Sequence, residues 1–133
     1  MSFCYLEKMC ILFFLNTRKP TFVKIFFGMT TFQDLDLSSQ LYNSIEELGF
    51  THPTPIQEQS FSVVRSGKDV VGIAQTGTGK TFAYMLPILR DLKFSKQITP
   101  RVLVLVPTRE LVLQVVDEIE KLTKYINLRV LGV

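Results

Sequence analysis

Eight consecutive residues carry the clearest chemical signal in this sequence. They match the phosphate-binding pattern G-x-x-x-x-G-K-[ST], with alanine in place of the first glycine. Small residues let successive backbone N–H groups turn toward phosphate oxygens. The lysine can then meet the β- and γ-phosphates, and the threonine hydroxyl can bind Mg²⁺. The sequence therefore predicts a nucleotide-binding loop made of Ala74, Gln75, Thr76, Gly77, Thr78, Gly79, Lys80 and Thr81.

A glycine-rich turn without a ligand is the alternative for this loop. Its flanks favour nucleotide binding, because a short apolar run at 69–74 precedes it and a helix is expected from 80 to 92. The positive end of that helix would face the phosphates. The pattern does not indicate which nucleotide is bound, since kinases, GTPases, transporters and helicases share it.

A second pattern lies upstream, at residues 49–57. The run Gly-Phe-Thr-His-Pro-Thr-Pro-Ile-Gln resembles the Q motif of DEAD-box RNA helicases. A glutamine amide can read the N6 and N7 edge of adenine with one donor and one acceptor, and an aromatic ring can pack on the base. The resemblance implies that Gln57 recognises the adenine of ATP. It implies the same of Phe32, which lies where the family has an isolated aromatic residue.

Both residues also have a structural alternative. Thr54 and Gln57 have the spacing of a capping box, in which the glutamine side chain binds the backbone at the start of a helix. Phe32 has the alternative of a core residue, since phenylalanine is most often buried.

A third pattern, Pro-Thr-Arg-Glu-Leu at 107–111, resembles motif Ia of the same family. The resemblance implies that Pro107, Thr108, Arg109 and Glu110 help to hold the sugar–phosphate backbone of RNA. A hydroxyl, an arginine and the free N–H groups of a helix N-terminus suit a phosphate. Thr108 is equally suited to cap the helix, and both roles are compatible. Val112 stands where the family usually has alanine, a mild departure.

The elements around these motifs indicate an α/β protein. Residues 102–106 are apolar without polar alternation, which predicts a buried strand of a parallel sheet. Pro87 is expected to bend its helix. The resemblance implies a RecA-like P-loop domain with an incomplete sheet. The expected helices are 39–48, 54–66, 80–92 and 109–125, and the expected strands are 69–74, 102–106 and 128–133.

The family's Gly-Gly, Asp-Glu-Ala-Asp and Ser-Ala-Thr motifs do not occur in these 133 residues. Hydrolysis in this class needs a carboxylate for the metal, a residue that orients water, and arginines from a second domain. We therefore expect no catalytic residue in this chain and no ATP hydrolysis. With strands of the sheet missing, we also expect exposed strand edges, marginal stability and a tendency to aggregate.

Residues 1–28 differ from residues 29–133. They hold both cysteines, four of the fifteen Lys and Arg residues, and one of the twelve Asp and Glu residues. Residues 29–133 therefore have eleven basic and eleven acidic residues and no net charge. The positive charge therefore gives no argument for RNA binding by 29–133. The apolar run 9–15 is too short to span a bilayer. We expect 1–28 to be a non-homologous extension, with Met29 a natural start, and expect a cytoplasmic protein without a membrane role.

Together the three motifs imply an ATP-dependent RNA helicase that uses ATP and Mg²⁺ and contacts the RNA backbone independently of sequence. Two alternatives remain: a catalytically inactive adenine-nucleotide-binding remnant, and a DNA-directed motor, against which the upstream motif argues. The sequence indicates no protein partner.

Overall fold

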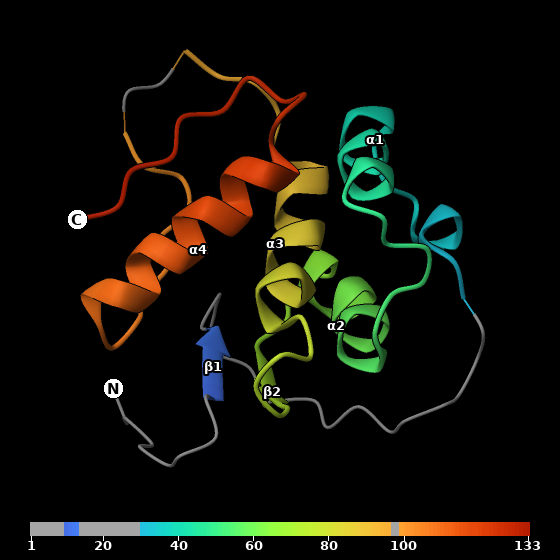
Figure 1. Cartoon of the computed structure of the whole chain (residues 1–133), viewed down its shortest axis with the longest axis horizontal. Helices are drawn as coiled ribbons and strands as arrows, with labels where there is room; N and C mark the ends of the chain where they lie inside the picture. The colour runs from blue at the N-terminus through green and yellow to red at the C-terminus, as the bar shows by residue number, and fades with distance from the viewer. Residues whose placement is uncertain (1–9, 14–29, 97–98) are drawn as a thin grey trace.

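The computed structural model describes residues 10–13, 30–96 and 99–133, and these residues form mainly helices. Figure 1 shows α3 in the middle, with α4 on one side and α1 and α2 on the other. The elements, in chain order, are β1 (Cys10–Phe13), the 3-10 helix η1 (Phe32–Leu35), α1 (Ser39–Glu47), α2 (Pro55–Arg65), β2 (Val70–Ile73), α3 (Lys80–Asp91) and α4 (Arg109–Leu122).

The helix ends lie where the local sequence signals predict them. The Ser38 hydroxyl caps α1 by accepting from the backbone N–H of Leu41 at 3.4 Å. Gly49 and Gly67 follow α1 and α2 with φ of 77° and 71°, a left-handed conformation that costs glycine little. The four predicted helices are confirmed, to within three residues at each end.

The core forms where the apolar faces of these helices meet around α3. Leu41 and Ile45 of α1, Leu86 of α3 and Leu122 of α4 are each less than 2% exposed. Helix α3 continues through Pro87, which was expected to bend or loosen it. Proline has no N–H to donate to the carbonyl four residues earlier, which belongs to Ala83. The Ser60 hydroxyl of α2 donates to that oxygen at 2.7 Å, so the buried carbonyl keeps a partner.

The strand predictions are only partly correct. Residues 70–73 form the predicted strand β2, but it is not buried, since Val71 and Ile73 are 44% and 69% exposed. Its partner in the described residues is β1, paired antiparallel with Cys10 opposite Ile73 and Phe13 opposite Val70. A parallel partner is not formed within the described ranges.

The strands predicted at 102–106 and 128–133 are wrong for this structure, which contains neither. Val104 and Val106 pack against the core, whereas Leu103 and Leu105 are 73% and 78% exposed. A strand needs a neighbour to pair its backbone groups, and within the described ranges neither segment is paired in a sheet. No helix in the described ranges is long and apolar enough to cross a membrane.

Candidate nucleotide-binding site

The phosphate-binding loop connects β2 to α3, as the sequence predicts. Gly77 and Gly79 have φ of 79° and 74°, a conformation that favours glycine, and the Thr78 hydroxyl donates to the Gln75 carbonyl at 2.7 Å. Gly79 is the N-cap of α3 and offers no side chain to its first turn. The N–H groups of that turn therefore remain available to an anion, so the loop fits a phosphate group.

Lys80 points into the loop. Its ammonium donates to the carbonyls of Ala74 at 2.7 Å and Gln75 at 2.5 Å, and the residue is 6% exposed. Burial lowers the pKa of Lys80 below its ordinary value, because the protein replaces water around the charge. An ammonium has three donors, so one remains for a phosphate oxygen.

Thr81 and Tyr84 lie in the first turns of α3. Thr81 is 8% exposed. Burial raises the pKa of Tyr84 to about 12, and a hydrogen bond with Thr81 acts in the opposite direction. The Thr81 hydroxyl is the group of this loop that suits Mg²⁺ bound to a nucleotide. The described residues contain no cluster of three or more His, Cys, Asp or Glu that could hold a metal ion.

Gln57 contacts both its own helix and the phosphate-binding loop. Its Oε1 accepts from the Thr54 N–H at 2.9 Å, so the capping box forms. Its Nε2 donates to the Gly79 carbonyl at 3.1 Å. The Thr54 hydroxyl donates to the Thr78 carbonyl at 3.0 Å, a contact that the sequence analysis did not predict. A Cβ on Gly79 would lie 2.3 Å from Gln57 Nε2 and would displace that amide, and the φ of 74° at this position favours glycine.

Phe32 lies in the core. It is 3% exposed and packs with the buried residues of the helices. A ring with so little exposed area offers no free face to a base. The structure therefore favours the core alternative for Phe32 over the predicted contact with adenine.

Residues 107–110 form the start of α4. All four are exposed, and the Thr108 hydroxyl accepts from the Leu111 N–H at 3.3 Å. The helix-cap alternative for Thr108 is thus realised. Arg109 and Glu110 face solvent in the first turn, where a phosphate of a nucleic acid could reach them together with free N–H groups.

Comparison with known proteins identifies relatives over most of the chain. A family model described as DEAD/DEAH box helicase matches residues 54–133. The "ATP-dependent RNA helicase DRS1" of Candida albicans is 48% identical over 98 residues, covering 74% of this chain and 16% of that protein. The "ATP-dependent RNA helicase SrmB" of Escherichia coli is 45% identical over 103 residues, covering 75% of this chain and 23% of that protein.

A solved structure shows the same fold. The chain in the "Crystal structure of the RNA-helicase Prp28 from Chaetomium thermophilum bound to ADP" matches with a TM-score of 0.68 and 34% identity, over 74% of this chain and 25% of that one. The predicted class, an α/β RecA-like domain with an incomplete sheet, is confirmed by this likeness. The present chain spans a quarter or less of the length of these relatives.

Proposed function

Because the chain belongs to the DEAD/DEAH box helicase family, we propose that it is the ATP-binding part of an ATP-dependent RNA helicase. We assign this role to residues 29–133 and treat 1–28 as an extension outside the domain. The absence of cysteine from 29–133 supports a reducing compartment such as the cytoplasm.

The observation that carries the proposal is the contact of Gln57 and Thr54 with the phosphate-binding loop. This contact supports the proposal, because the Gln57 amide lies beside a loop that fits phosphates. A glutamine amide has two N–H donors and two acceptor positions. Gln57 uses one of each within the protein, which leaves one donor and one acceptor. The residue is 5% exposed, so its amide must turn toward solvent to reach the edge of adenine.

Within this proposal the residues of the loop have separate tasks. Backbone N–H groups from 74–79 and the first turn of α3 bind phosphate oxygens. Lys80 contributes a positive charge, and the Thr81 hydroxyl is a ligand for Mg²⁺. The metal supplies charge neutralisation to the phosphates when it is bound.

The RNA contact is proposed for the exposed turn at the start of α4. Thr108, Arg109 and the N–H groups of the turn support binding to the sugar–phosphate backbone, with Pro107 and Glu110 beside them. Such contacts carry no base information, so the binding is independent of sequence.

Binding without turnover is the activity proposed for this chain by itself. Its 133 residues contain none of the family's acidic motif, so no carboxylate stands in the position that holds the metal for hydrolysis. We propose unwinding of RNA only for a full-length helicase of this family. In such a protein this chain would contribute ATP binding and part of the RNA contact.

The proposal is tested by measuring ATP binding and ADP release with the same protein. Calorimetric titration with ATP and Mg²⁺ should show binding, and Lys80→Ala should weaken it about 10-fold or more, since a hydrogen bond to a charged group contributes about 1.5–3 kcal/mol. Lys68→Ala, which removes an exposed lysine outside the site, is the control. ADP release should not exceed that of a protein-free sample. Unchanged ATP binding by the Lys80 variant, or steady ADP production by the purified chain, would overturn the proposal.

A further inference from the structure

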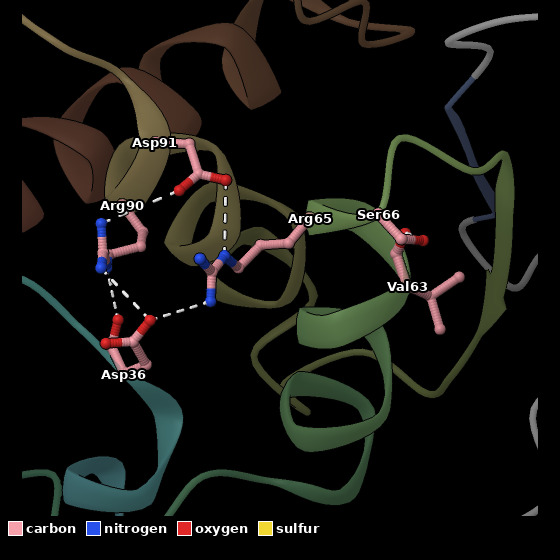
Figure 2. A network of polar contacts seen from close by, with 6 residues as sticks. All are labelled: Asp36, Val63, Arg65, Ser66, Arg90 and Asp91. Atoms are coloured by element: carbon pink, nitrogen blue, oxygen red, sulfur yellow. Dashed lines mark hydrogen bonds and ion pairs between the residues drawn. The ribbon is translucent and has the colours of Figure 1, made fainter.

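Four charged side chains form a network that connects η1 to the last turns of α2 and α3 (Figure 2). Asp36 Oδ2 lies 3.1 Å from Arg65 Nη1 and 3.2 Å from Arg90 Nη2. Asp91 Oδ2 lies 3.4 Å from Arg65 Nε, and Asp91 Oδ1 lies 3.8 Å from Arg90 Nη1. Arg90 Nε also donates to the Asp36 carbonyl oxygen. We call Asp36, Arg65, Arg90 and Asp91 the Asp36 clamp.

The backbone conformation of Asp36 is unusual for a residue with a side chain. Its φ of 36° and ψ of 47° are left-handed, and it is the one non-glycine residue with positive φ in the described part of the chain. Glycine takes this conformation without cost, and aspartate takes it more readily than most other residues with a Cβ, so the strain at this position is small. Here the side chain meets two guanidinium groups, and Arg90 foremost holds the pKa of Asp36 below its usual range.

The Asp36 clamp joins the last turns of α2 and α3, and the first turns of the same two helices form the candidate nucleotide site. Gln57 and Thr54, at the start of α2, contact the carbonyls of Gly79 and Thr78, just before α3 begins. Helices of 11 and 12 residues are about 16–18 Å long at 1.5 Å per residue. The α2–α3 pair is therefore joined at the site by one set of polar contacts and at the far end by the Asp36 clamp.

We propose that Asp36 is a positioning residue for the nucleotide site. Through Arg65 and Arg90 it sets the orientation of α2, which carries Gln57, relative to α3, which begins at the phosphate-binding loop. This inference rests on the proposed function. ATP contacts both helices and depends on their relative orientation. Inorganic tripolyphosphate contacts only the loop and makes no contact with the base-reading amide. The loop is held by its glycines, by the hydrogen bond from Thr78 to Gln75, and by the bonds from α2 to Thr78 and Gly79.

Two variants of Asp36 separate charge from backbone strain. Asp36→Asn keeps the size of the side chain and tolerates left-handed φ, but removes the charge. Asp36→Gly removes the side chain and the strain together. Asp117→Asn breaks a comparable exposed ion pair, with Lys121 of α4, and is the matched control.

The dissociation constants of ATP and of tripolyphosphate, both with Mg²⁺, are measured by calorimetry at low salt. Both Asp36 variants should weaken ATP binding about threefold, which is the effect expected from the loss of exposed ion pairs. Tripolyphosphate binding should be weakened less than ATP binding, and the Asp117 variant should change the affinity of neither ligand. Equal weakening of both ligands, or unchanged ATP binding, would overturn the inference.

A wild-type chain that binds neither ligand contradicts the proposed function itself. In that event hydrogen exchange decides the positioning role. Asp36→Asn should accelerate exchange of the hydrogen-bonded backbone amides of Thr54 and Glu58, at the far end of α2, relative to the Asp117 control. Equal exchange there in the two variants would show that the clamp does not act on the site.

Discussion

The hydrogen bond from Ser60 to the Ala83 carbonyl explains how α3 tolerates Pro87, and this explanation can be tested by substitution. Ser60 and Ala83 are 7% and 4% exposed, and the donor–acceptor distance is 2.7 Å. Replacing Ser60 with alanine leaves the Ala83 oxygen buried without a partner. We expect a loss of about 1–3 kcal/mol in the free energy of unfolding, the cost of an unsatisfied buried polar group.

The same reasoning predicts that the cost depends on Pro87. In Pro87→Ala the new N–H can donate to the Ala83 oxygen, as in an ordinary helix. Ser60→Ala should then cost less, by about 1 kcal/mol, in the Pro87→Ala background than in the wild type. Urea unfolding followed by far-UV circular dichroism gives the four free energies of this cycle. Equal costs in the two backgrounds would refute the compensation by Ser60.

Three further predictions concern the site, the start of α4 and the contact between α1 and α4. Gln57→Glu keeps the acceptor of the capping box, but it loses the donor to Gly79 and places a negative charge beside the phosphates. ATP should therefore bind at least about 10-fold more weakly, as measured by calorimetry. Wild-type affinity in this variant would contradict the assigned position of Gln57. Thr108→Ala should cost about 1 kcal/mol in urea unfolding, because α4 loses its cap, and no change would show that the cap is unimportant. The hydrogen bond from Lys124 holds the pKa of Glu47 below its ordinary value. The stability that this contact contributes is fully present above the ordinary carboxyl pKa. It is lost as the pH falls through the lower pKa of Glu47 in the folded state. We therefore compare the free energy of unfolding of the wild type and of Glu47→Gln as a function of pH between about pH 5 and pH 2. The two should differ most near pH 5 and become equal near pH 2. A constant difference across this range would argue against the contact.

Local signals were sufficient to predict the helices and the phosphate-binding loop. A serine or threonine before an apolar run and a glycine after it mark helix ends through bonds between near neighbours. The loop needs glycine at 77 and 79 for backbone reasons that do not depend on the rest of the fold. The capping box of Gln57 was foreseen for the same reason, since its partner is three residues away.

Contacts between distant residues could not be predicted in this way. The apolar run 102–106 has the composition of a buried strand, but a strand forms only where another offers its backbone. The contacts of Gln57 with Gly79 and of Ser60 with Ala83 join residues that lie 22 and 23 positions apart. The sequence around Phe32 contains no local signal that separates a base contact from a core position. Its burial, which depends on the fold, favours the core.

The exposed apolar residues bear on the expectation that the chain aggregates. Ile73, Leu103, Leu105 and Leu131 are each between 69% and 80% exposed. Exposed apolar side chains are sites for association between molecules. We expect a concentration-dependent rise in particle size by light scattering. A monodisperse monomer over a wide concentration range would contradict this prediction.

The central claim, that the chain carries an adenine-specific nucleotide site, is tested most directly by equilibrium titration with ATP and GTP in the presence of Mg²⁺. The two nucleotides share their phosphates and differ in the base, so under the proposed function the loop binds them alike and Gln57 distinguishes them. The account predicts binding of ATP at least about 10-fold tighter than GTP, the value of one good pair of hydrogen bonds to a base edge. Equal affinities, or no binding of either nucleotide, would contradict it.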